Sequence, residues 1–111
     1  MNLSYKIIAG SGILLGIIHQ TFALGADKFT QNTLWFIGSG FAIIFAGFLN
    51  LALINISPKD LLLRTLCIIA NLTITILFVV ALLTVLRKPQ VFVGIGIFAL
   101  LTVFSALEKD I

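Results

Sequence analysis

Residues 12–23 have the sequence Gly12-Ile-Leu-Leu-Gly16-Ile-Ile-His19-Gln20-Thr-Phe-Ala23, which places the one histidine of the chain inside a long apolar run. Gly12, Gly16, His19 and Ala23 are spaced by four, three and four residues, so they share one face of a helix. Three of these side chains are small, which allows a second helix to approach closely. We therefore predict a membrane-spanning helix whose small-residue face packs against protein.

The composition of the whole chain indicates the same class of protein. Of its 111 residues, 60% are hydrophobic and 10% are charged, and the mean hydropathy is +1.22. A soluble chain this short could not cover so much apolar surface, whereas about 20 apolar residues in a helix span the hydrocarbon of a bilayer. The length allows four such spans, so we predict one transmembrane domain. The first apolar run lacks the pattern of a cleavable signal peptide, and we expect residue 1 to be the mature start.

Short polar segments divide the chain into four helices, which we predict at about residues 5–24, 33–56, 58–87 and 90–107. The longest polar link, residues 25–33, has nine residues, so consecutive helices must lie side by side and antiparallel. The predicted fold class is an all-α membrane protein with four transmembrane helices in an antiparallel up-down-up-down bundle.

The segment Ser57-Pro58-Lys59-Asp60 gives the clearest helix start. A serine cap, a proline at the first helical position and an acid at the third match a capping box, in which the two side chains satisfy free backbone amides. We therefore place the start of the third helix here. Its length up to Arg87 exceeds what the hydrocarbon needs, so we expect a tilt, or a first turn at the interface with Arg64 directed toward the headgroups.

The cations give a weak orientation signal. The side with both termini holds four of them, and the opposite side holds three. The cations on the side with the termini are Lys6, Lys59, Arg64 and Lys109. Those on the opposite side are Lys28, Arg87 and Lys88. This balance favours a multi-pass membrane protein with both termini in the cytoplasm, although a margin of one charge also allows insertion in both orientations. Tyr5 and Lys6 are expected at the level of the headgroups.

Polar side chains within the spans are the candidates for function, because a polar group in hydrocarbon has no water to bond. All four acids lie in loops or in the C-terminal tail, so His19 is the one intramembrane side chain expected to titrate near neutral pH. Antiparallel helices bring residues equally far from a shared loop to the same depth, which predicts two polar layers. The first layer contains His19, Trp35, Ser39, Thr84 and Gly94. The second, nearer the termini, contains Asn50, Asn71 and Thr75.

His19 has three interpretations: a neutral imidazole bonded to a neighbouring helix, a group that holds a ligand or accepts a proton, or a ligand of a metal or haem. One histidine and one cysteine, Cys67, on different helices and at different depths do not make a metal set. No intramembrane carboxylate is present to orient a catalytic base. We therefore predict no catalytic residue, no metal and no cofactor.

Two groups of candidate residues follow. The candidates for ligand binding or for the polar layers are His19, Gln20, Trp35, Ser39, Asn50 and Asn71. For the asparagines, fixing the register between helices is the structural alternative. The candidates for close helix packing are Gly12, Gly16, Gly40 and Gly47.

Two motifs, Gly16-x-x-His19-x-x-Phe22 and Leu34-Trp35-Phe36-x-Gly38-x-Gly40, resemble those of small, uncharacterised bacterial four-helix membrane proteins. In these proteins a G-x-x-H run ends the first helix and an F/L-W-F-x-x-x-G run starts the second. The resemblance covers about the first fifty residues; it implies the same topology and a role for His19 and Trp35, but no activity. In length and span count the chain is also similar to small multidrug-resistance transporters, but it lacks the glutamate in the first helix that their proton antiport needs.

These observations favour a non-catalytic module that binds a lipid-like molecule or the helices of a partner membrane protein, including a second copy of the chain. His19, Gln20 and Ser39 would orient the bound molecule, and Trp35 would fix its depth. The alternative is a dimeric small transporter or channel gated by protonation of His19. An enzyme or a haem protein is a third hypothesis. The net charge of +3 lies in short loops, so we expect the bilayer and no nucleic acid as a partner.

Overall fold

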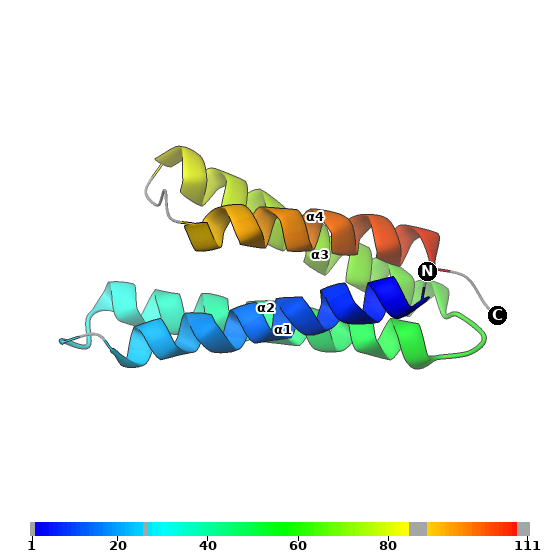
Figure 1. The fold of residues 1–111 in the computed structure, drawn as a ribbon, viewed down its shortest axis with the longest axis horizontal. Coiled ribbons are helices and arrows are strands. Elements are labelled where there is room, and N and C mark those ends of the chain that lie inside the picture. The colour runs from blue at the N-terminus through cyan, green and yellow to red at the C-terminus, as the bar shows by residue number, and fades with distance from the viewer. Residues whose placement is uncertain (1, 26, 85–88, 109–111) are drawn as a thin grey trace.

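The computed structural model consists of four α-helices and describes residues 2–25, 27–84 and 89–108 (Figure 1). The helices are α1 (Asn2–Leu24), α2 (Gln31–Asn55), α3 (Leu61–Thr84) and α4 (Pro89–Leu107). Consecutive helices run antiparallel and pack as one bundle. The predicted all-α, up-down-up-down fold is confirmed.

All four helices are long and apolar enough to cross a membrane. The shortest, α4, has 19 residues, which at 1.5 Å per residue corresponds to about 28 Å, close to the roughly 30 Å of hydrocarbon in a bilayer. The bundle measures 49 Å along its longest axis. These dimensions and compositions indicate a multi-pass membrane protein.

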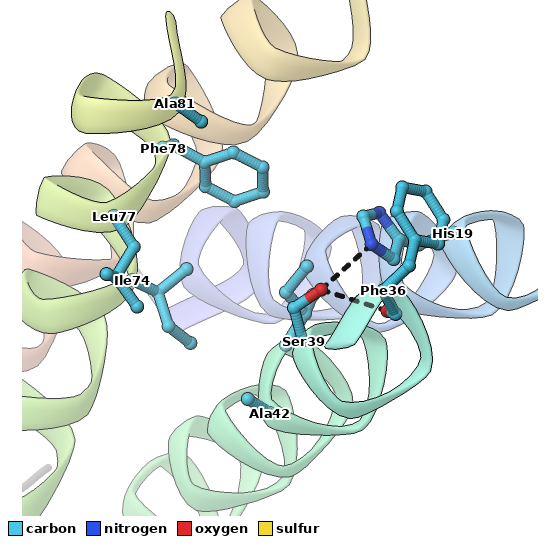
Figure 2. Close-up of a pocket in the computed structure, with 9 residues that line it drawn as sticks. His19, Phe36, Ser39, Ala42, Ile74, Leu77, Phe78 and Ala81 are labelled. Carbon is cyan, nitrogen blue, oxygen red and sulfur yellow. Dashed lines mark hydrogen bonds between the residues drawn. The ribbon is translucent and has the colours of Figure 1, made fainter. Parts of the chain in front are cut away.

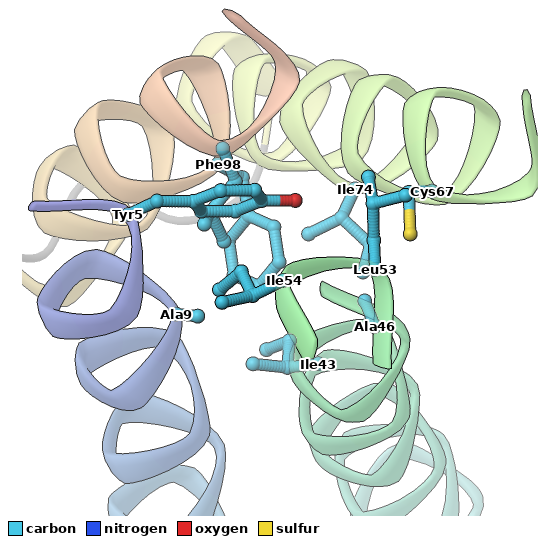
Figure 3. Packing of buried hydrophobic residues seen from close by; sticks show 10 residues of the cluster. Tyr5, Ala9, Ile43, Ala46, Leu53, Ile54, Cys67, Ile74 and Phe98 are labelled. Carbon is cyan, nitrogen blue, oxygen red and sulfur yellow. The ribbon is translucent and has the colours of Figure 1, made fainter. Parts of the chain in front are cut away.

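The bundle is built from two helical hairpins. α1 packs most extensively against α2, and α3 packs most extensively against α4. The hairpins lie close together at the end of the bundle that holds the chain termini, and they diverge toward the opposite end, as Figure 1 shows. A cluster of buried apolar side chains joins them in between, with Ile43 and Leu53 from α2, Ile74 from α3 and Phe98 from α4 (Figure 3).

One face of α1 is buried along its length. The buried positions recur every three or four residues and include Tyr5, Ala9, Gly12, Gly16, His19 and Ala23. A Cβ atom placed on Gly16 would lie 2.6 Å from Cγ1 of Ile44, and one on Gly47 of α2 would lie 2.4 Å from Cγ1 of Ile13. Since real side chains do not approach so closely, these glycines are what allows α1 and α2 to pack at their observed separation.

The predicted helix boundaries need correction at α1 and α2. α1 begins at Asn2 instead of residue 5, and α2 spans Gln31–Asn55 instead of residues 33–56. The first turn of α2 is closed by a capping box, in which Oγ1 of Thr30 accepts from the amide of Thr33 at 3.2 Å and Oγ1 of Thr33 accepts from the amide of Thr30 at 3.3 Å. The prediction was too short because it treated polar residues as loop, whereas a cap lets a helix extend beyond the hydrocarbon.

The predicted start of the third helix at residues 57–58 is wrong. α3 begins at Leu61, and its cap is Asp60, whose Oδ1 accepts from the amide of Leu62 at 3.0 Å. Nζ of Lys59 donates to the carbonyl oxygens of Leu53 and Ile54 at 2.8 and 3.0 Å, so the preceding segment closes the C-terminus of α2 instead of opening α3. The predicted end of this helix at residue 87 lies outside the described residues, and α4 begins at Pro89 instead of residue 90.

Arg64, which was expected at the headgroups if the first turn of the third helix lay at the interface, has partners at the end of a neighbouring helix. Its guanidinium donates to the carbonyl oxygens of Ser105 at 2.9 Å and Ala106 at 3.1 Å, and to that of Glu108. These carbonyls belong to the C-terminal end of α4, where an α-helix has no amide partners of its own and carries partial negative charge. Arg64 therefore caps α4 and ties it to α3.

We expect Arg64→Met to lower the free energy of unfolding by about 1 kcal/mol, because the carbonyls at the end of α4 lose their donor. Unfolding in mixed detergent micelles, followed by circular dichroism, measures the change. Lys6→Met removes an exposed cation of α1 and is the matched control. An equal loss of stability in both variants would contradict the capping role.

Candidate functional site

A crevice of about 200 Å³ lies between α2 and α3 and contains the chain's histidine in its wall. We call it the His19 crevice. α1 contributes His19, and α2 contributes Phe36, Ser39, Ala42 and Ile43. The α3 side consists of Ile74, Leu77, Phe78 and Ala81 (Figure 2). His19 and Ser39 are the polar residues of this lining, and they lie on the wall opposite Leu77 and Phe78.

The imidazole of His19 is held at its edge and on its face. Nε2 lies 3.0 Å from Oγ of Ser39, and this hydroxyl donates to the carbonyl oxygen of Phe36 at 2.9 Å. The ring of Phe36 stacks on the imidazole, with ring centroids 3.6 Å apart and planes inclined by 7°. The ring of His19 is therefore fixed in orientation, and the structure brings His19 and Ser39 together as one polar edge.

Two features of the sequence produce this edge. Phe36 and Ser39 are three residues apart, so they lie on the same face of α2. The backbones of α1 and α2 approach closely just beside it, since a Cβ atom on Gly16 would lie 3.1 Å from the carbonyl oxygen of Gly40. This close approach puts the imidazole of His19 within hydrogen-bonding distance of Ser39.

Gln20 lies next to His19 in the chain but does not line the crevice. Its Nε2 donates to the carbonyl oxygen of Ile37 at 3.0 Å, and its carboxamide lies over Gly40, where a Cβ atom would come within 2.7 Å of it. Its Oε1 is buried without a hydrogen-bond partner among the described residues. The structure thus places Gln20 in the contact between α1 and α2.

The first predicted polar layer does not form as a whole. Trp35 is 65% exposed, and the ring of His19 stacks on Phe36. Adjacent residues are about 100° apart around a helix, so α2 cannot direct both side chains at the imidazole. Thr84 is exposed and bonds to Val80 of its own helix, and Gly94 is buried beneath the ring of Phe78. These three residues do not join His19 and Ser39.

The second predicted layer forms part of a buried network that links all four helices. Nδ2 of Asn50 donates to Oδ1 of Asn71 at 2.7 Å, and Nδ2 of Asn71 donates to Oδ1 of Asn50 at 2.8 Å. The hydroxyl of Tyr5 donates to Oδ1 of Asn50 at 2.6 Å, and Nδ2 of Asn71 also donates to Oγ of Ser105 at 3.3 Å. We call these four fully buried residues the four-helix network. Thr75 donates to the carbonyl oxygen of Asn71 within α3.

Sequence reasoning missed Tyr5 and Ser105 as members of this network. Only a depth at the headgroups was predicted for Tyr5; its side chain is fully buried within the bundle, and its ring stacks on Phe104 with centroids 5.6 Å apart. A signal was present for Tyr5, because the spacing of four and three that joins Ala23 to Gly12 continues backward through Ala9 to Tyr5. Ser105 carried no comparable signal.

Comparison with protein-family models, with curated proteins and with solved structures found no match to this chain. Among the described residues, no three histidine, cysteine, aspartate or glutamate side chains lie together as a metal site would require. Cys67 is buried, and its Sγ lies 3.1 Å from the carbonyl oxygen of Leu49. The chemistry that the His19 crevice offers is a hydrogen-bonding edge facing an apolar wall.

Proposed function

We propose that this protein is a non-catalytic module of the bacterial inner membrane that binds one lipid-like molecule in the His19 crevice. The observation that carries the proposal is the crevice itself, in which seven of nine lining residues are apolar and two form a polar edge. Small-molecule sites in proteins are typically apolar with a few polar groups that fix orientation. An apolar cavity of about 150 Å³ holds a benzene molecule, so a crevice of about 200 Å³ has room for a segment of one lipid chain.

The position of the crevice supports entry from the bilayer. It lies between α2 and α3, which belong to different hairpins, and the hairpins diverge toward this end of the bundle (Figure 1). A chain within the membrane can therefore enter sideways without crossing the headgroup region. We propose that both termini face the cytoplasm, as the cation balance favours. The crevice then lies in the outer half of the membrane.

The alternative, a dimeric transporter or channel gated by His19, is less well supported by the residues that lie between the His19 crevice and the four-helix network. A transport path through one protomer would have to run from His19 toward the end that holds the termini. Along α2, the buried residues Ile43 and Ala46 separate Ser39 from Asn50, and along α3 Ile74 separates the crevice from Asn71. This apolar layer argues against a polar route between the crevice and the four-helix network.

A crevice-filling substitution tests the proposal. We expect the wild-type protein, extracted in a mild detergent, to retain a molecule of lipid mass in native mass spectrometry. Ala81→Phe should lose it, because the added ring occupies the crevice, whereas Ala99→Phe on the exposed side of α4 should retain it. A wild-type protein free of lipid in every detergent, or equal retention by the two variants, would overturn the proposal.

Transport is tested on the same preparations. We expect proteoliposomes containing wild-type protein or His19→Ala to take up a permeant dye at the rate of empty vesicles. A flux that requires His19 would instead establish the transporter.

A further inference from the structure

The single proton of the Ser39 hydroxyl determines how the polar edge of the His19 crevice is arranged. Oγ of Ser39 lies 2.9 Å from the carbonyl oxygen of Phe36, which can only accept, so the hydroxyl donates there. The contact of 3.0 Å between this Oγ and Nε2 of His19 then requires Nε2 to carry a proton and to donate it. No lining residue is an acid that would stabilise an imidazolium, so the ring is neutral and its lone pair is on Nδ1.

The atoms at this edge that can still form a hydrogen bond are both acceptors. Nδ1 of His19 has no hydrogen-bond partner among the residues that the structure describes, and Oγ of Ser39 has a second lone pair. Nδ1 is not among the fully buried unpaired atoms of the described residues, so it is accessible from the crevice, whose other lining residues apart from Ser39 are apolar and offer it no donor. A bound molecule that donates a hydrogen bond satisfies this acceptor.

The absence of charged residues from the lining restricts which chemical group of a bound molecule can be the donor. The nine lining residues include no lysine, arginine, aspartate or glutamate. A phosphate or carboxylate would lose its hydration without meeting a cation and would face lone pairs, and an ammonium group would meet no acid. The group that fits is uncharged and donates one proton, which is the chemistry of a hydroxyl.

We infer that the His19 crevice binds a neutral, single-chain lipid alcohol, whose hydroxyl donates to Nδ1 of His19 and whose chain lies against Leu77 and Phe78. The inference rests on the proposed function and specifies the class of ligand for the same site. The size of the crevice agrees with a segment of one chain, because about 200 Å³ is only somewhat larger than the apolar cavity of about 150 Å³ that holds a benzene molecule.

The experiment uses the fact that the chain has one histidine. Protein labelled with nitrogen-15 histidine, in lipid nanodiscs, gives one resonance for each ring nitrogen, and the positions of the two report which nitrogen is protonated. The probes are dodecanol, its methyl ether and dodecanoate, compared at equal mole fraction in the bilayer. The ether keeps the chain and the oxygen of dodecanol but cannot donate.

We expect the free protein to show a protonated Nε2 and an unprotonated Nδ1. Dodecanol should shift the Nδ1 resonance saturably and bind about tenfold more tightly than the ether, as one hydrogen bond predicts. Dodecanoate should cause no shift. Ala81→Phe should abolish the response to dodecanol, and Ala99→Phe should preserve it.

The possible failures are distinguishable. A protonated Nδ1 in the free protein, or equal affinity for dodecanol and its ether, would overturn the alcohol assignment while leaving lipid binding intact. If none of the probes binds and the extracted protein also carries no lipid, the proposed function itself is wrong.

Discussion

Replacing Gly47 with leucine is expected to lower the free energy of unfolding by about 3 kcal/mol, the upper part of the usual range for overpacking. A Cβ atom at this position would lie 2.4 Å from Cγ1 of Ile13 and 3.5 Å from the backbone nitrogen of the same residue. Cγ1 of Ile13 can move away only by rotation about the Cα–Cβ bond, and because one rotamer of isoleucine is strongly preferred in a helix, relief of the contact strains Ile13 or moves α1. We therefore expect the variant to separate α1 from α2, and with them the two sides of the polar edge at His19.

Gly96→Leu is the matched control for this prediction. A Cβ atom on Gly96 would meet nothing within 4 Å, and the residue is exposed on α4. Both variants exchange a helical glycine for the same larger side chain, so their difference isolates the contact with Ile13. Unfolding in mixed micelles gives the two free energies, and the nitrogen-15 spectrum of His19 reports the displacement of α1. Similar stability of the two variants would show that α1 and α2 are not held together by this contact.

Asn71→Leu is expected to lower the free energy of unfolding by about 2 kcal/mol. Leucine has a similar shape but removes the carboxamide that bonds to Asn50, to Ser105 and to the carbonyl oxygen of Leu101. A single hydrogen bond between membrane helices contributes about 0.6 kcal/mol on average, but this substitution removes several at once and leaves buried partners unsatisfied. Asn55→Leu provides the control, because Asn55 is exposed and bonds only within α2.

A double-mutant cycle makes this prediction specific to the pair. Asn50→Leu combined with Asn71→Leu should cost less than the sum of the single substitutions, because each single change already disrupts the bonds between the two carboxamides. Strictly additive losses would mean that the asparagines do not act as a pair.

The sequence was sufficient to predict the class of fold, and two pairs of contacts as well. Apolar length and polar interruptions report directly on spans, and antiparallel connection by short links follows from chain length. Depth counting grouped His19 with Ser39, because these two residues are equally far from the loop that their helices share, and it placed Asn50 and Asn71 together in the layer nearer the termini.

What depth counting could not supply is the rotation of each helix about its own axis. Trp35 has nearly the same depth as Phe36, but only Phe36 contacts His19. The α3 wall of the crevice was unpredictable for a related reason. It depends on how far the hairpins diverge and on where Phe78 lies, and Phe78 lies over Gly94 of α4. Such distances depend on side-chain packing across helices, which one sequence does not reveal.

The prediction of where α3 starts was wrong because the same residues can either begin a helix or close the end of the preceding one. Ser57 and Pro58 match the beginning of a helix, but Lys59 is bonded to the last carbonyls of α2, and Asp60 caps α3. A motif considered alone favoured the first solution, and the packed ends of two helices favoured the second.

The asymmetry of the four-helix network bears on how the chain is assembled during translation. Asn50 already has partners within the first hairpin, since its carboxamide contacts Tyr5 and the carbonyl oxygen of Ala46. Among the described residues, the side-chain bonds of Asn71 all run to α2 and α4. A nascent chain that stops after α3 therefore carries in Asn71 an amide whose partners on α4 have not yet been made. The two bonds between Asn50 and Asn71 already join the hairpins through α2 and α3, and the last helix completes the network by supplying the other partners of Asn71.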